Sequence, residues 1–149
     1  MYKRILVPLD GSRRAEAILS HVEELAQELG AEILFMQVLD PDIGLITPYD
    51  MVPYYDEEAI TRMRKDVDLY LQQLVADSQA RGNQARRLIF EGPIVRSILE
   101  AARQENADLI AMASHGRTGL ARVFYGSVAA GVLQQADRPL LIIRTSEAD

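Results

Sequence analysis

Apolar residues follow two different periods along this chain, and the two periods alternate. Segments in which apolar residues recur every three or four positions, typical of helices, occupy residues 13–29, 57–80, 94–102 and 126–135. Short continuous apolar runs, typical of buried strands, occupy residues 4–9, 31–39, 85–90, 108–112 and 138–144. Strands that alternate with helices predict a parallel sheet covered on both faces, with right-handed crossovers. We therefore expect a three-layer α/β/α, doubly wound fold with a five-stranded parallel sheet.

Turn-forming residues separate these segments. Asp10, Gly11 and Ser12 form a turn that ends in a good helix N-cap, and Gly30 stops the helix that follows. Residues 40–56 have no clean periodicity and contain three prolines, three tyrosines and four acidic residues. A loop of this size in a compact domain is usually functional or partly mobile. No repeat, low-complexity tract or linker interrupts the chain, so we expect a single domain over residues 1–149.

The composition limits the class of protein. With 149 residues, of which 48% are hydrophobic, the chain has enough apolar material for one core. A net charge of -6 argues against binding to nucleic acid or to an anionic membrane, because both require a basic surface. The sequence has no cysteine, which excludes thiolate metal sites and fits a cytoplasmic protein. No apolar run approaches the length that crosses a membrane, so we expect no membrane insertion.

The most informative stretch lies between the fourth predicted strand and the fourth predicted helix. Residues 109–136 contain no acidic side chain, although the whole chain is acidic, and they include His115, Arg117 and Arg122. A strand, a glycine-bearing loop and a helix in this order present backbone N–H groups to an anion. Gly126 and Ser127 stand where the helix begins, so we predict a phosphate-binding loop here.

A second candidate group lies at the end of the first predicted strand. Doubly wound folds bind ligands at the carboxyl ends of the strands, where the winding reverses. If the first and fourth strands flank that point, Pro8, Leu9 and Asp10 face residues 112–116 across a crevice. Asp10 can then accept from ribose hydroxyls, join a metal shell, or only form the turn with its neighbours. A carboxylate repels phosphates unless a cation intervenes, so Mg²⁺ is compatible with this site, although no ligand cluster indicates it.

On these residues the chain resembles the universal stress protein family, in its ATP-binding branch. The resemblance covers nearly the whole chain and includes residues 5–12, Val38 and residues 107–110. Its most specific part is residues 114–119, followed by residues 126–128. Motifs at these positions come from both sides of the expected crevice.

The resemblance includes the family's phosphate-loop signature, with one departure. That signature is a glycine, two residues, a glycine, nine residues and then Gly-Ser or Gly-Thr. Gly116 is the second glycine here, and Gly126 and Ser127 follow after nine residues. Ala113 stands at the first glycine's position, which adds a methyl group where the backbone approaches the ligand.

The resemblance implies a sheet in the order 3-2-1-4-5 and a bound ATP. By position, Pro8, Asp10 and Val38 would hold the adenine and the ribose. The residues around the ribose and the phosphates would be Met112, Ala113, His115, Gly116, Gly126, Ser127 and Val128. The same motifs also contain the remaining candidates for cofactor binding, Leu9, Arg117 and Gly119. A role in stress response and signalling, rather than one catalysed reaction, is implied as well.

The resemblance further implies a homodimer that pairs through the last strand. That strand carries Leu140, Leu141, Ile142 and Ile143 and would lie at the edge of the sheet. An exposed apolar edge needs to be covered, which supports strand pairing between two copies.

Several assignments stay open between two interpretations. His115 either contacts a phosphate when protonated or only lies in the loop, and Arg117 either attracts phosphates or is solvated. The motifs of P-loop ATPases, Rossmann dehydrogenases, serine hydrolases and zinc proteases are absent, and no residue stands out as a base that activates water. The leading hypothesis is a nucleotide-dependent stress sensor or regulator. The alternatives are a nucleotide-independent interaction protein, which would regulate a transporter or an enzyme through the tyrosine-rich loop, and a slow ATPase.

Overall fold

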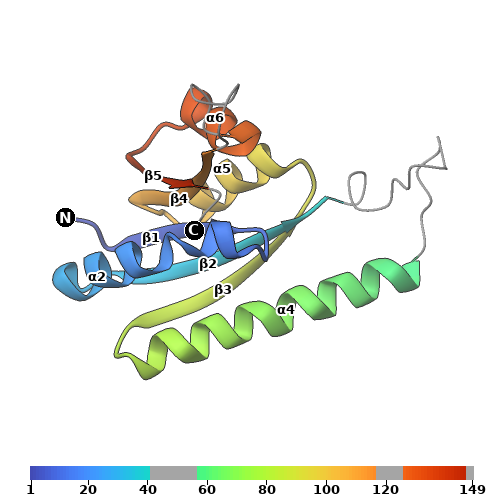
Figure 1. Cartoon of the computed structure of the whole chain (residues 1–149), viewed down its shortest axis with the longest axis horizontal. Coiled ribbons are helices and arrows are strands. Elements are labelled where there is room, and N and C mark those ends of the chain that lie inside the picture. Colours follow the sequence, from blue (N-terminus) through green and yellow to red (C-terminus); the bar gives the residue numbers. More distant parts are fainter. Residues whose placement is uncertain (41–56, 117–125, 147–149) are drawn as a thin grey trace.

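The computed structural model describes residues 1–40, 57–116 and 126–146. Its five strands form one parallel sheet in the order β3-β2-β1-β4-β5 (Figure 1), which confirms the predicted fold class and strand order. The strands are β1 (Arg4–Leu9), β2 (Glu32–Leu39), β3 (Gln84–Glu91), β4 (Leu109–Gly116) and β5 (Leu140–Ser146).

Helices cover both faces of this sheet and enclose two separate cores. One face carries α1 (Arg13–Glu16), α2 (Leu19–Leu29) and α4 (Glu57–Ala80), and the other carries α5 (Ile94–Gln104) and α6 (Gly126–Gln135). The strand β1 lies in the middle of the sheet, and its side chains alternate between the two cores. Ile5, for example, packs toward α2 and α4, whereas Leu6 packs toward α5 and α6, and both are fully buried.

The first predicted helix is interrupted. The helix α1 ends at Glu16 and α2 begins at Leu19, because the Ala17 N–H donates to the carbonyl of Arg14, three residues earlier. Such a bond tightens the backbone into a 3₁₀-type turn. The apolar period continues across the break, so periodicity alone predicted one helix over residues 13–29. The predicted stop was correct, since Gly30 caps α2 in the left-handed conformation with φ of 66°.

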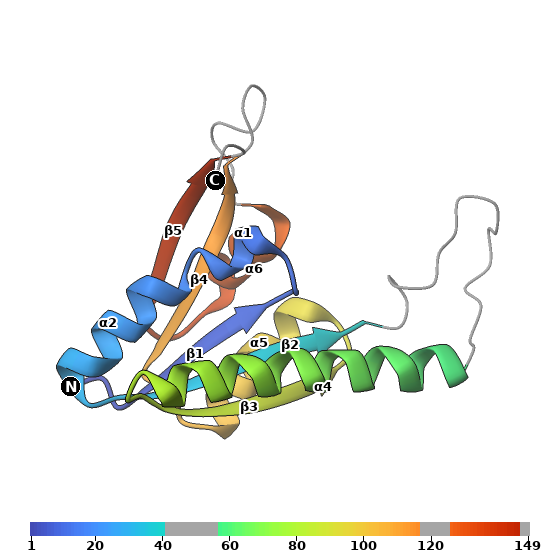
Figure 2. The ribbon, with the colours of Figure 1, turned by 60° about the horizontal axis from the view of Figure 1, so that its bottom comes forward.

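The strand β4 is longer than its apolar run, and the predicted end at Met112 was wrong. It continues to Gly116 beside β5, which itself reaches Ser146, and Figure 2 shows this pair extending together past the end of β1. Two polar side chains join the extended part: Thr145 Oγ1 donates to the carbonyl of Ser114 at 2.8 Å, and Ser114 Oγ donates to the carbonyl of Ile143 at 3.2 Å. Backbone pairing and hydroxyl groups, rather than apolar residues, continue the strand here.

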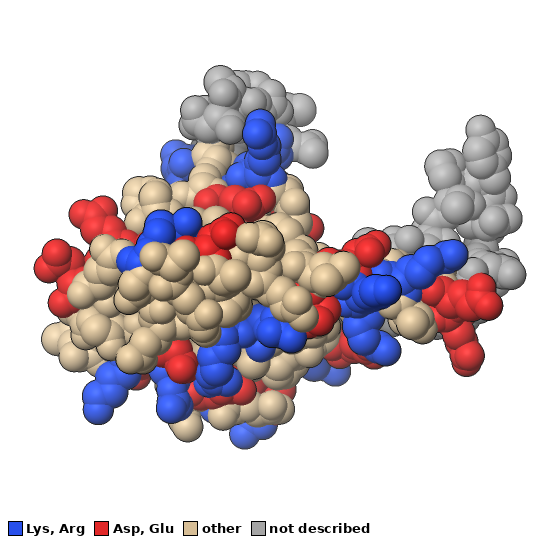
Figure 3. All heavy atoms as spheres, turned by 90° about the horizontal axis from the view of Figure 1, so that it is seen from below, with Lys and Arg blue, Asp and Glu red and all other residues tan. Residues whose placement is uncertain are grey.

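The helix α4 is 24 residues long, and its amino-terminal end extends beyond the strands (Figure 2). Ion pairs join it to β3, among them Arg87 Nε with Asp68 Oδ1 at 2.7 Å, and Arg64 with Glu91. On the face seen in Figure 3, basic and acidic side chains of the described residues are interspersed with other residues. None of the described helices is both long and apolar enough to cross a membrane. The predicted tyrosine-rich loop falls mainly on residues 41–56, which lie outside the described residues.

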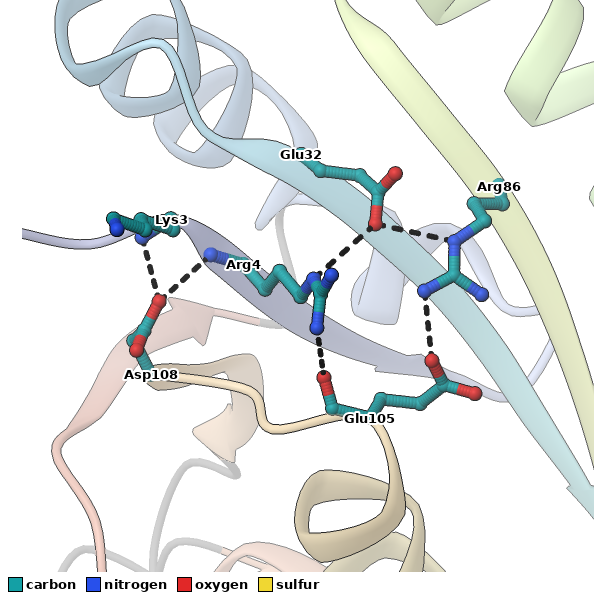
Figure 4. Close-up of polar contacts among 6 residues, drawn as sticks. All are labelled: Lys3, Arg4, Glu32, Arg86, Glu105 and Asp108. Carbon is teal, nitrogen blue, oxygen red and sulfur yellow. Dashed lines mark hydrogen bonds and ion pairs between the residues drawn. The ribbon is translucent and has the colours of Figure 1, made fainter.

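A network of charged side chains joins the amino-terminal ends of three strands (Figure 4). Arg86 of β3 donates to Glu32 of β2 at 3.1 Å and to the carboxylate of Glu105, just after α5, at 2.7 Å. Arg4 of β1 donates to the backbone carbonyl of Glu105 at 3.0 Å. This network lies at the amino-terminal ends of the strands. Its charged side chains therefore do not reach the opposite end of the sheet, where the carboxyl ends of the strands lie.

Candidate functional site

A pocket forms where β1 and β4 separate. These two strands pair at Ile5 with Leu109 and at Leu6 with Ile110, and β4 then continues beside β5 alone within the described residues. Pro8 follows in β1 and has no N–H group to donate to a neighbouring strand. The chain passes from β1 to α1 on one face and from β4 to α6 on the other, so this is the point where the winding reverses.

The pocket has a volume of about 170 Å³. A single water needs about 10–15 Å³ by the same measure, so this space can admit a ligand of many atoms. Six elements contribute, namely the ends of β1 and β2, the strand β4, and the helices α1, α5 and α6. The lining residues are Pro8, Leu9, Asp10, Arg14, Ala15, Val38, Ile94, Ile98, Met112, Ala113, Ser114, Gly126, Ser127, Val128 and Ala129.

One part of the pocket wall is apolar. Val38 from β2, Ile94 and Ile98 from α5, and Met112 from β4 belong to the core between the sheet and α5–α6, and they also border the pocket. Aliphatic walls of this kind suit a flat aromatic ring, which gains from burial without needing a charged partner. This part of the pocket can therefore hold a heterocyclic base.

The amino-terminal end of α6 forms the polar part of the wall. Gly126 has a φ of 71°, a left-handed conformation that favours glycine, and Ser127 follows it with an exposed side chain. The first N–H groups of a helix have no partner within the helix and carry partial positive charge. No acidic residue stands in the first turn of α6 to compete for them. This end can accept an anion such as a phosphate.

Asp10 lies at the end of β1 with an exposed side chain. Its Oδ1 atom accepts the Ser12 N–H at 2.9 Å, so the predicted turn is present. A carboxylate has about four lone-pair sites, so Asp10 can also accept from the hydroxyls of a ligand. The turn and a ligand contact are therefore compatible functions of the same carboxylate.

Tyr70 of α4 lies close to the carboxylates of Glu16 and Asp10, although it does not border the pocket. Its hydroxyl is buried. Burial raises the pKa of the Tyr70 phenol far above its usual range, and the negative charge of Glu16 raises it further. Tyr70 therefore stays neutral and adds no charge beside the site.

The donor set bears on whether this site could hold a metal. Across residues 1–40, 57–116 and 126–146, no group of three or more His, Asp or Glu side chains is arranged to hold a metal ion. Asp10 is the one carboxylate that borders the pocket in this part of the chain. The described side chains by themselves therefore do not form a Mg²⁺ site, and an ion held at Asp10 would need further ligands, such as the phosphates of a nucleotide.

Most of the predicted site residues border this one pocket. Those are Pro8, Leu9, Asp10, Val38, Met112, Ala113, Gly126, Ser127 and Val128. His115 and Gly116 extend β4 opposite Thr145 and Ser146, and the side chain of His115 is outside the described part of the structure. Arg117 and Gly119 lie outside the described residues altogether.

Several pocket residues were missed by the sequence analysis. They are Arg14, Ala15, Ile94, Ile98, Ser114 and Ala129. Ile94 and Ile98 were predicted only as the buried stripe of their helix, and they fulfil both functions. The position of Arg14 in the sequence could have identified it as a pocket residue. It lies in the first helical turn after β1, and the turn after a strand that flanks the point where the winding reverses borders the crevice.

Fold and pocket together define a doubly wound α/β protein with a pocket at the carboxyl ends of its central strands. The chain belongs to the universal stress protein family, whose model matches residues 1–144. It is similar to the universal stress protein MJ0531 of Methanocaldococcus jannaschii, with 30% identity over 152 residues that cover 97% of this chain and 83% of that protein. Another relative in that organism, the universal stress protein MJ0577, is 25% identical over 155 residues, covering 97% of this chain and 96% of that protein.

Solved structures agree with this assignment. The structure of MJ0577 has a TM-score of 0.82 at 26% identity and covers 99% of each chain. A universal stress protein in complex with cAMP has a TM-score of 0.67 at 20% identity, covering 97% of this chain and 98% of that one. The Archaeoglobus fulgidus universal stress protein in complex with dAMP has a TM-score of 0.66 at 23% identity, covering 95% and 98%. At these identities, the two nucleotide complexes are evidence of a shared fold.

Proposed function

We propose that this protein binds an adenine nucleotide, with ATP as its ligand, and acts as a nucleotide-dependent stress sensor or regulator in the cytoplasm. The observation that carries the proposal is the pocket between β1 and β4, which joins an apolar wall to the amino-terminal end of α6. A nucleotide has two matching parts, a flat aromatic base whose faces pack on apolar side chains and an anionic tail. Relatives of the same fold in complex with cAMP and dAMP support the choice of adenine.

The groups that line the pocket indicate how the ligand would lie in it. The base would pack against Val38, Ile94 and Ile98, and the ribose hydroxyls would donate to Asp10. The phosphates would accept from the N–H groups at Gly126 and from the Ser127 hydroxyl. Each charge-assisted bond contributes about 1.5–3 kcal/mol, so a few of them, less the cost of ordering, support an affinity of about micromolar. We propose Mg²⁺ only as an ion carried by the phosphates.

We also propose that two copies pair through the edge strand β5. This strand lies at one end of the sheet order, with β4 as its neighbour on one side. Its apolar residues Leu140 to Ile143 are only partly buried in one copy. A partner strand would satisfy the outer backbone groups and cover these side chains.

The test begins with the ligand that accompanies the purified protein. Denaturing the protein and analysing the supernatant by chromatography should release an adenine nucleotide. Titration calorimetry with ATP, ADP, AMP and GTP should then give an affinity of about micromolar for ATP and a weaker one for GTP. Absence of binding by every adenine nucleotide at millimolar concentration would contradict the proposal.

A pair of glycine variants connects the binding to the pocket. Gly126→Val places a branched side chain where the phosphates would lie, so ATP affinity should fall by at least about ten-fold. Gly82→Val is the matched control, because Gly82 also has a positive φ, of 93°, and lies in the turn between α4 and β3. The control carries similar backbone strain and should bind ATP like the wild type. Equal affinity in the two variants would show that the ligand does not bind at the α6 end.

A further inference from the structure

Arg14 is the basic side chain that borders the pocket in the described part of the chain. We propose that its guanidinium contacts the phosphates of the bound nucleotide from the α1 side, opposite the amino-terminal end of α6. This inference rests on the proposed nucleotide binding and names the group that makes the pocket select a phosphorylated ligand.

The position of Arg14 is fixed by the turn that precedes it. The Asp10 carboxylate accepts the Ser12 N–H at 2.9 Å, and Ser12 Oγ accepts the Ala15 N–H at 3.1 Å. These two bonds hold the first turn of α1 against the end of β1. Within that turn Arg14 is half-buried and borders the pocket, whereas its neighbour Arg13 is exposed and does not. The orientation of the turn therefore brings one of two adjacent arginines to the pocket.

The charges of the pocket give this arginine a function. Asp10 borders the same pocket, and its negative charge opposes the approach of a phosphate. A guanidinium offsets that repulsion and presents several donors in a planar fork that matches phosphate oxygens. With a whole-chain net charge of -6, an anionic ligand gains more from a cation inside the pocket than from the surface as a whole.

The two helices on opposite sides of the pocket contact the same strand, β4. Both α1 and α6 pack on β4, α1 from the face of α2 and α4, and α6 from the opposite face. Arg14 and Ser127 both line the pocket, so a phosphate bound between these helices would have Arg14 on one side and Ser127 on the other. Arg14 should contribute to the binding of the phosphates and little to the binding of the base, which packs against α5.

The experiment compares two neighbouring arginine variants of the full-length protein. Binding of adenosine, ADP and ATP to the wild type, Arg14→Gln and Arg13→Gln is measured by titration calorimetry in excess EDTA, so that no divalent ion masks the arginine. Loss of one charge-assisted contact in Arg14→Gln should weaken ADP and ATP by about ten-fold or more. Adenosine should change by less than about two-fold, and Arg13→Gln should bind all three ligands like the wild type. Thermal unfolding of each variant establishes that the fold is intact.

Two outcomes separate this inference from the function on which it rests. If the wild type binds ATP and Arg14→Gln binds it equally well, or if adenosine weakens as much as ATP, the assignment of Arg14 is overturned and nucleotide binding stands. If the wild type binds none of the three ligands, the proposed function fails and the inference falls with it. A preserved difference in affinity between adenosine and ATP in Arg13→Gln, together with a difference that is about ten-fold smaller in Arg14→Gln, supports the assignment.

Discussion

Pro8 and Gly126 both act on the site through the backbone. Pro8 lacks an N–H and lies in β1 just past its last pairing with β4, at Leu6, where the two strands separate. Gly126 adopts a φ of 71°, which a residue with a Cβ reaches at a cost of roughly 1–2 kcal/mol. At this scale, the pocket depends on a missing backbone N–H in β1 and on the left-handed conformation at the start of α6.

Asp108 provides a stability prediction at the same scale. Its carboxylate accepts the backbone N–H groups of Lys3 at 2.6 Å and Arg4 at 2.9 Å, and these bonds lower the pKa of Asp108 below its ordinary value (Figure 4). Because the folded pKa is lowered, the stabilisation is complete above the ordinary value and is lost as the pH falls through the lowered one. Asp108→Ala should therefore reduce the free energy of unfolding by about 1 kcal/mol at neutral pH.

The measurement is urea unfolding of the wild type and Asp108→Ala at neutral pH and near pH 3. The difference between the two proteins should shrink as the pH falls. Asp66→Ala, which removes an exposed carboxylate of α4, serves as the control and should change stability little at either pH. A difference that stays constant from neutral to acidic pH would contradict this account of Asp108.

At the scale of elements, α5 and α6 pack closely on the face of the sheet that borders the apolar pocket wall. The close approach depends on Gly131, because a Cβ there would lie 2.7 Å from Val95 Cγ2. Since α6 also carries Gly126 and Ser127 at its start, the packing of its middle on α5 sets where its amino-terminal end points. Helix packing and the proposed ligand binding are thus connected through one helix.

Gly131→Ala tests this packing. Alanine is favoured over glycine in a helix by up to about 1 kcal/mol, whereas overpacking a tight contact costs about 1–3 kcal/mol. Because Val95 is branched at Cβ and stiff, the contact should dominate, and the variant should lose about 1 kcal/mol. In a Val95→Ala background the same substitution should become neutral or stabilising, which a double-mutant cycle in urea measures. Additive effects of the two substitutions would disprove the close contact.

At the scale of the whole molecule, the two ends of the sheet have different functions. The amino-terminal ends of the strands carry the ion pairs among Arg4, Glu32, Arg86 and Glu105, which are satisfied within the chain. The carboxyl ends carry the pocket, where β1 and β4 separate. The strands β3 and β5 lie at the two edges of the sheet, and the proposed pairing uses β5.

Ile142→Pro tests the proposed dimer. The Ile110 N–H donates to the carbonyl of Pro139, and the alternation of a parallel ladder then places the N–H of Ile142 on the outer edge of β5. Proline removes that donor at a position where edge strands accept it. Sedimentation velocity should give a dimer for the wild type and a folded monomer for the variant. A monomeric wild type at micromolar concentration, or a dimeric variant, would show that β5 does not pair.

Much of the fold was predictable because local patterns carried it. Strand β1 is apolar at every position from Ile5 to Leu9, and Gly30 marked the end of α2 correctly. The break between Glu16 and Leu19 was not predictable, since a tight turn keeps nearly the same apolar period as a helix. The extension of β4 to Gly116 was not predictable either, because it depends on pairing with a strand that comes later in the chain.

The sequence alone determined the class of fold, the order of its elements and the motifs that lie on either side of the crevice. These properties follow from the spacing of apolar residues, glycines and prolines, which act on the backbone locally. Only the tertiary structure decided that Arg14 rather than Arg13 borders the pocket, and that Ile94 and Ile98 serve both core and site. The physical reason is that a pocket is made by residues distant in sequence, and their shared neighbourhood exists only after β1, β4, α1, α5 and α6 have packed together.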